Sequence, residues 1–95
     1  MTLAPEIDGG LDFIDTLIEF GIKPQLGHTL ASNDICNLSI NKGVESFTHL
    51  YNAMSGNHHR NSGVLAAALD LGSFAEIICD LNHVNKTSIK ICLLY

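Results

Sequence analysis

Apolar and polar residues follow two spacings along this chain. Between residues 11 and 20 apolar residues recur every three or four positions with acidic residues between them, which predicts an amphipathic helix. Short apolar runs bounded by turn residues are typical of buried strands. The predicted strands are 1–4, 22–26, 44–49 and 74–79. The predicted helices are 11–20, 32–42, 63–71 and a last one that begins after Asn85.

Cap and turn residues divide these elements. Asp8 is the candidate N-cap of the first helix, and Gly21 supplies its C-terminal stop. Ser32 is placed to cap the second helix and Gly43 to close it, while residues 52–62 read as a loop. Four strands that alternate with helices indicate parallel strands joined by right-handed crossovers.

The predicted fold class is therefore α/β. Four βα units are half of an eight-stranded barrel. We interpret residues 1–95 as a parallel (βα)4 portion of a TIM-like (β/α)8 barrel, without a separate second domain. No glycine-rich phosphate loop follows the first strand, which disfavours a nucleotide-binding sheet.

Composition indicates a fragment. The chain has 95 residues, of which 46% are hydrophobic and 16% charged, and a mean hydropathy of +0.23. So short a chain has little interior volume in which to bury that much apolar surface. We expect about half of a barrel, whose uncovered strand edges would make the isolated chain aggregate or pack loosely.

Charge and cysteine content exclude several classes. A net charge of -5 without a basic cluster disfavours nucleic-acid binding. No apolar run approaches the roughly 20 residues of a membrane span, and residues 1–6 do not resemble a signal peptide. Cys36, Cys79 and Cys92 are an odd number at wide spacing, typical of buried thiols in a reducing compartment, so we expect a cytoplasmic protein.

Three histidines carry the candidate chemistry. His28, His49 and His83 each fall near the predicted carboxyl end of a successive strand, and parallel strands in a barrel bring those ends to one rim. Each one alone is explained as well by a hydrogen-bonded structural role. Together they favour a site for a divalent metal, with zinc the first choice, because neutral imidazole is a common zinc ligand.

The loop after His49 offers further polar groups. The guanidinium of Arg60 suits a phosphate or carboxylate, although a loop arginine is often only a surface residue. His58 and His59 read as a solvated turn. Asp80 lies three residues before His83 and is placed to orient its ring.

Several motifs resemble one family. They are Thr-Leu-Ala-Pro-Glu at 2–6, Gly-His-Thr at 27–29, Thr-His-Leu-Tyr-Asn-Ala-Met at 48–54, Arg60 with Gly63, and Asp-x-x-His-Val at 80–84. In this order they resemble the N-acetylglucosamine-6-phosphate deacetylases of the amidohydrolase superfamily. The block at 48–54 is the specific one. The resemblance implies a metal-dependent hydrolase with a distorted (β/α)8 barrel that converts its substrate into glucosamine 6-phosphate and acetate.

The resemblance also implies residue roles. His28 and His49 match the two histidine ligands of the catalytic metal. The residues that match substrate-binding positions, for a sugar phosphate, are Asn52, Ala53, Arg60 and His83. The family's glutamate ligand and catalytic aspartate are expected outside this chain, so no catalytic residue is assigned and the chain alone is expected to be inactive. A homo-oligomer is expected for the full-length enzyme.

Two departures and two alternatives accompany this reading. Ser62 stands where the family has proline, and Leu81 replaces the glycine of an Asp-Gly-x-His motif. One alternative is a fragment of another amidohydrolase, sharing His28 and His49 but not the phosphate contact of Arg60. The other is a non-catalytic module in which two half-barrels assemble and cover each other's apolar faces.

Overall fold

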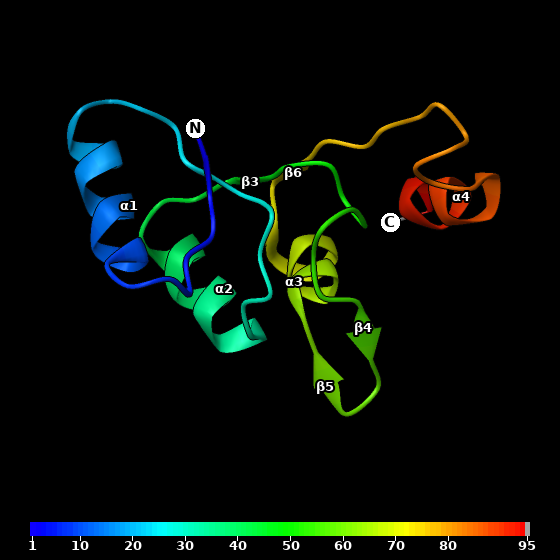
Figure 1. Ribbon diagram of the computed structural model, residues 1–95, viewed down its shortest axis with the longest axis horizontal. Coiled ribbons are helices and arrows are strands. Elements are labelled where there is room, and N and C mark those ends of the chain that lie inside the picture. Colours follow the sequence, from blue (N-terminus) through cyan, green and yellow to red (C-terminus); the bar gives the residue numbers. More distant parts are fainter. Residues whose placement is uncertain (95) are drawn as a thin grey trace.

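The computed structural model describes residues 1–94 and shows helices alternating with short strands (Figure 1). Their order is β1 (Thr2–Leu3), α1 (Gly10–Glu19), β2 (Gln25–Leu26), α2 (Asn33–Asn41), β3 (Ser46–Phe47), β4 (Asn57–His58), β5 (Asn61–Ser62), α3 (Val64–Leu71), β6 (Phe74–Ala75) and α4 (Lys86–Leu93). The β4–β5 hairpin interrupts the alternation. No helix among the described residues is long and apolar enough to cross a membrane.

Within residues 1–94 the principal sheet has the order β1-β2-β3-β6, and every pairing in it is parallel. Parallel neighbours require crossover connections, and α1, α2 and α3 supply them. Leu26 lies beside both Leu3 and Phe47 in the register. The predicted α/β class with a parallel sheet is thus confirmed.

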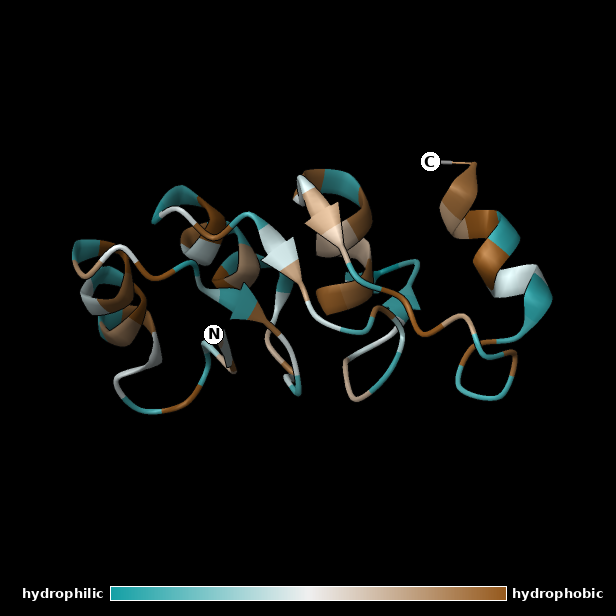
Figure 2. Ribbon diagram, turned by 90° about the horizontal axis from the view of Figure 1, so that it is seen from above, coloured by the Kyte–Doolittle hydropathy of each residue, from teal (hydrophilic) through white to brown (hydrophobic). Residues whose placement is uncertain are grey.

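The hydrophobic core lies between one face of this sheet and a row of three helices. Leu26 and Phe47 are fully buried, and Ile14 and Leu17 of α1 pack into the same cluster. Figures 1 and 2 show α1, α2 and α3 side by side along the sheet, and α2 contacts both of the others. Helix α4 stands apart at the C-terminal end and contributes no buried residue.

The other face of the sheet carries polar side chains in a connected row. The side chain of Gln25 donates to Glu76 Oε1 (3.1 Å) and accepts from Thr48 Oγ1 (3.0 Å), whose hydroxyl also bonds that of Thr2 (2.8 Å). A Cβ on Gly27 would approach Thr2 Cγ2 to 2.7 Å and Thr48 Cβ to 2.9 Å. Glycine is therefore required between these threonines.

Three local predictions were wrong or too coarse. The paired strands are two residues long where runs of four to six were predicted. Gly9, in left-handed conformation (φ 75°), caps α1 without a side-chain bond, so Asp8 is not its N-cap. The predicted loop 52–62 contains the β4–β5 hairpin. By contrast, Ser32 caps α2 as predicted, with Oγ accepting from Ile35 N at 3.3 Å.

Candidate metal centre

His28 and His49 occupy equivalent positions beyond two paired strands. Leu26 and Phe47 are register partners, and each histidine follows its strand by two residues. Regular alternation would keep both side chains on the buried, helix-facing side of the sheet. Instead, φ is 49° at His28 and 37° at His49, so the extended backbone ends there. His28 is exposed and His49 half-buried.

The two imidazoles lie together. Their ring centroids are 4.5 Å apart and the ring planes meet at 80°. His49 Nδ1 is the one buried side-chain nitrogen or oxygen in residues 1–94 without a hydrogen-bond partner. A buried imidazole nitrogen with no partner is available to a ligand, and this donor set fits a divalent ion such as zinc.

The described residues supply only part of a metal centre. No group of three or more His, Cys, Asp or Glu side chains able to hold an ion occurs within 1–94. A catalytic zinc site has three protein ligands and an open position. A catalytic zinc centre at His28 and His49 would need at least one further protein ligand beyond the described residues.

Backbone contacts join the loop that carries His28 to the loop that carries His49. The N–H of Thr29 donates to the carbonyl oxygen of Ala53 at 3.0 Å, and Thr29 forms a parallel bridge with Met54. Thr29 is 1% exposed, so this link lies in the interior. It fixes the rim on which both rings stand.

Asn52 and Ala53 belong to the same rim. Asn52 N donates to the carbonyl of His49 at 2.9 Å, and its side-chain amide donates to the Leu50 carbonyl at 3.4 Å. Ala53 is exposed and has a φ of 50°. Backbone hydrogen bonds thus tie both predicted substrate residues to the two histidine loops, Asn52 to His49 and Ala53 to Thr29.

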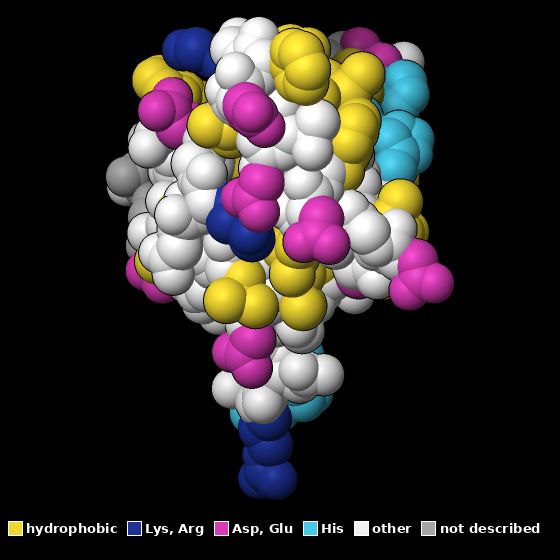
Figure 3. Space-filling view, turned by 90° about the vertical axis from the view of Figure 1, so that its left-hand side faces the viewer, with side chains coloured by type: hydrophobic (Ala, Val, Ile, Leu, Met, Phe, Trp, Pro, Cys, Tyr) yellow, Lys and Arg dark blue, Asp and Glu magenta, His cyan; other side chains and the backbone are white. Residues whose placement is uncertain are grey.

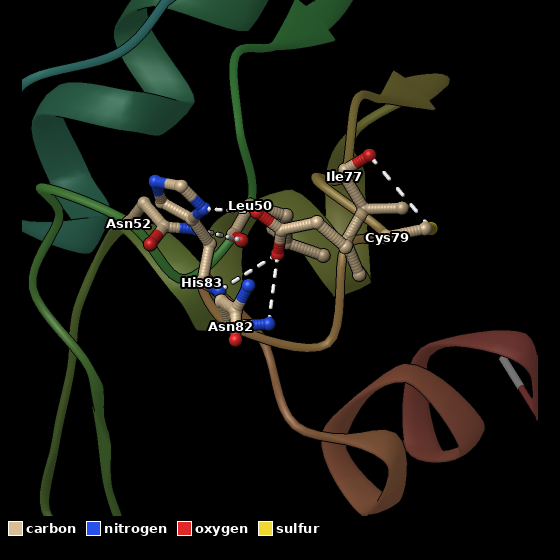
Figure 4. A network of polar contacts seen from close by, with 7 residues as sticks. Leu50, Asn52, Ile77, Cys79, Asn82 and His83 are labelled. Carbon is tan, nitrogen blue, oxygen red and sulfur yellow. Dashed lines mark hydrogen bonds and ion pairs between the residues drawn. The ribbon is translucent and has the colours of Figure 1, made fainter.

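His83 lies further from its strand than predicted, because β6 ends at Ala75. Asp80 holds it: Oδ1 accepts from the backbone N–H groups of Asn82 and His83 at 2.9 and 2.8 Å, and Oδ2 lies 2.6 Å from His83 Nδ1 (Figure 4). The backbone N–H and then the ring of His83, followed by the N–H of Asn82, lower the pKa of Asp80 to about 2. Asp80 thus orients His83.

Arg60 lies at the turn of the β4–β5 hairpin, which projects from the body (Figure 1). Figure 3 shows basic and histidine side chains at that projecting end, and acidic ones over the α1 end of the molecule. His58 and His59 are exposed, with centroids 4.3 Å apart. The small pocket that Arg60 lines contains residues of α2 and β5 but neither His28 nor His49.

Sequence reasoning missed the polar row on the open face. Gln25 pairs with Ser46 in the register and its side chain donates to Glu76, yet neither Gln25 nor Glu76 belongs to a recognisable motif. Thr48 did offer a signal, because it is a polar residue in an apolar run directly before His49.

No protein-family model matches the chain. It is 38% identical over 92 residues to N-acetylglucosamine-6-phosphate deacetylase of Vibrio furnissii, which covers 96% of this chain and 23% of the relative. The corresponding enzyme of Bacillus subtilis is 38% identical over 95 residues, covering 99% and 24%. N-acetylgalactosamine-6-phosphate deacetylase of Escherichia coli O157:H7 is 33% identical over 93 residues, covering 97% and 25%.

Solved structures of N-acetylglucosamine-6-phosphate deacetylases also resemble the chain. A Mycobacterium smegmatis N-acetyl-D-glucosamine-6-phosphate deacetylase, in complex with N-acetyl-D-glucosamine-6-phosphate, superposes with a TM-score of 0.92 at 33% identity over 98% of this chain and 25% of that one. The Thermotoga maritima enzyme also gives 0.92, at 30% identity over 98% and 26%.

The parallel sheet, its helices and the loops beyond the strand ends therefore match part of an α/β hydrolase with a barrel-like fold. Within that class, the homologues and structural neighbours of the chain are N-acetylglucosamine-6-phosphate deacetylases, and the chain corresponds to a fragment that spans about a quarter of their length. The resemblance seen in the sequence motifs is confirmed.

Proposed function

We propose that this chain is a segment of a metal-dependent amide hydrolase, an enzyme that removes acetate from N-acetylglucosamine 6-phosphate. The segment supplies two ligands of the metal centre and binds the sugar phosphate. The observation that carries the proposal is the pair of imidazoles beyond β2 and β3, 4.5 Å apart, with a buried nitrogen of His49 free for a ligand within residues 1–94. The names of the relatives support the substrate.

His28 and His49 provide two neutral nitrogen donors for a divalent ion, with zinc the preferred one. When bound, such an ion supplies Lewis-acid chemistry, which polarises an amide carbonyl and acidifies water. The left-handed backbone at both residues holds the rings at the rim. The third ligand and the general base come from outside these 95 residues, so the chain alone is inactive.

Four residues bind the substrate in this proposal: Asn52, Ala53, Arg60 and His83. Arg60 offers a planar fork of donors to the phosphate. His83 presents Nε2 to the sugar, because Asp80 engages Nδ1. The four parallel strands make half of an eight-stranded barrel in a cytoplasmic, homo-oligomeric enzyme. The three free thiols agree with a reducing compartment, but only Cys36 is buried as predicted, since Cys92 is half-buried and Cys79 exposed.

Zinc titration of the 95-residue chain tests the metal site. We expect weak binding of one ion, and His28→Ala or His49→Ala should each cost more affinity than the ~10-fold typical of losing an outer-shell partner. His59→Ala is the matched control, since His59 is exposed at the hairpin turn and should leave the affinity as it is. Equal losses in all three variants, or no binding, would refute the metal site.

The N-acetylgalactosamine 6-phosphate relative favours a second candidate, the same reaction on the C4 epimer. A chimera separates the two: residues 1–95 replace the matching segment of the Bacillus subtilis enzyme, and acetate release from each sugar phosphate is measured. A higher kcat/KM for N-acetylglucosamine 6-phosphate supports the first candidate. A preference for the epimer supports the second.

In the same chimera, Arg60→Ala should raise KM for the sugar 6-phosphate. An unchanged KM would favour a different amide substrate.

A further inference from the structure

Glu6, in the loop after β1, accepts two hydrogen bonds from the loop that follows His28. Thr29 Oγ1 donates to Glu6 Oε2 at 2.5 Å, and Leu30 N donates to Oε1 at 2.8 Å. Both oxygens of one carboxylate thus engage the two residues that directly follow His28. A side chain from a distant strand end fixes this loop at two points.

Thr29 passes the constraint to the next loop. Its hydroxyl is held by Glu6 and accepts from Ala31 N at 3.1 Å, while its own N–H donates to Ala53 O at 3.0 Å. Ala53 lies four residues after His49. One chain of hydrogen bonds therefore runs from the β1 loop through the His28 loop to the His49 loop.

The two hydrogen bonds of Glu6 restrain loops whose backbone conformation is strained. Non-glycine residues with positive φ persist only where their surroundings fix them, and His28, His49 and Ala53 all have positive φ. Burial raises the pKa of the Glu6 carboxyl, but hydrogen bonds from Thr29 and Leu30 outweigh it and hold the pKa below its ordinary value of 4.5. Glu6 is therefore ionised near neutral pH, and charge-assisted hydrogen bonds are the stronger kind.

We propose that Glu6 is a positioning residue of the metal centre: by anchoring Thr29 and Leu30 it sets the spacing of the two imidazoles without touching a ligand itself. The proposal rests on the metal site proposed above and deepens it, because it adds a third loop to the two that carry the rings. The conformation of the pair then depends on a residue more than 20 positions upstream of either histidine.

Imidazole ¹H–¹⁵N NMR of the 95-residue chain without metal tests the positioning directly. Glu6→Gln keeps the size of the side chain but removes its charge and replaces one of the two acceptor oxygens by an NH2 donor, so Thr29 Oγ1 and Leu30 N can no longer both donate to it. The variant should shift the ring signals of His28 and His49 while leaving those of His58 and His59 in place. Asp8→Asn is the control: it removes a charge from the same loop, and Asp8 makes no side-chain hydrogen bond among the described residues. If Glu6→Gln leaves both rings unmoved, or moves them no more than Asp8→Asn, the proposal is wrong.

Zinc affinity is the second measurement. Glu6→Gln should weaken binding ~10-fold, as for other supporting residues of metal sites, with the far-UV circular dichroism unchanged; wild-type affinity in this variant would overturn the proposal. Should Glu6→Gln fail to fold, Glu6→Asp keeps the charge but reaches less far, and the same shifts and loss are expected of it. A wild-type chain that binds no zinc through His28 and His49 would refute the metal site, whereas the NMR shifts would still decide whether Glu6 positions the rings.

Discussion

Five residues other than glycine have positive φ within residues 1–94, and each follows a strand of the principal sheet. They are His28, His49, Tyr51, Ala53 and Leu81. Four of them lie on the loops of the candidate metal centre. Strained backbone conformations of this kind are common at functional sites. Leu81 differs, because it is bulky, 62% exposed, and replaces the glycine of the family motif. Its φ of 66° shows why glycine suits that position.

Leu81→Gly should therefore stabilise the chain. Relief of the left-handed strain stabilises the folded chain by ~1–2 kcal/mol, and the greater freedom of glycine in the unfolded chain costs ~0.5–1 kcal/mol, so the middle of both ranges leaves a gain of about 0.75 kcal/mol. Urea unfolding of dilute protein measures it. Asn82→Gly is the control. The φ of Asn82 is not positive, so this substitution relieves no strain and should only destabilise the chain, through the greater freedom of glycine in the unfolded state. A Leu81→Gly protein no more stable than wild type would contradict this account of the strain.

The Asp80 carboxylate should titrate far below its ordinary range. Its pKa falls from 3.8 to about 2 because the His83 backbone, the His83 ring and the Asn82 backbone bond the ionised form. A lowered folded-state pKa means that these bonds stabilise the loop above about pH 3.8 and are lost as the pH falls toward 2. ¹³C NMR of the carboxyl group measures the midpoint. His83→Ala should raise it only part of the way, since the N–H donors remain; a wild-type midpoint near 3.8 would show that the turn does not form.

At the scale of elements, helices were more predictable than strands. The spacing of apolar residues located α1, α2 and α3 to within a residue or two, since burial of one helix face is encoded locally. Strand ends depend on the neighbour that the strand pairs with, and β6 pairs with β3 over only two residues. The β4–β5 hairpin escaped prediction because its strands are polar and exposed.

The candidate site shows the same division. The positions of His28 and His49 could be read from the apolar runs before them, because consecutive parallel strands end at one rim. The left-handed backbone at these residues and the Glu6 anchor could not, since both depend on contacts between loops more than 20 residues apart. Sequence thus located the ligand candidates but not the groups that hold them.

Helix α3 begins on a cap supplied from another loop. Ser55 Oγ accepts from Val64 N at 2.9 Å, and the Ser55 carbonyl accepts from Leu65 N at 3.1 Å, while Gly63 at the N-cap offers no side chain. Ser55→Ala should cost about 1 kcal/mol, the typical loss of a cap. Ser62→Ala, beside the same helix, is the control, because Ser62 makes no side-chain hydrogen bond among the described residues. Urea midpoints that fall equally in both variants would rule out capping by Ser55.

At the scale of the whole molecule, the helix-free side of the sheet decides how the chain behaves in solution. Phe74 is 66% exposed, and it lines a pocket of about 510 Å³ together with Ala75 of β6 and Ile18 of α1, among others. Within residues 1–94 β1 and β6 each have one unpaired edge, and such edges and apolar patches promote association.

The isolated chain should therefore associate as its concentration rises, and Phe74→Lys should reduce this by placing a charge on the open side of the sheet. Sedimentation velocity over a dilution series measures both. Phe20→Lys is the matched control: Phe20 is 76% exposed at the end of α1 and does not line the pocket. A discrete dimer that Phe74→Lys dissociates would favour the self-assembling half-barrel, whereas aggregates of mixed size would favour an enzyme fragment. A chain that stays monomeric at every concentration would show that the open side needs no cover.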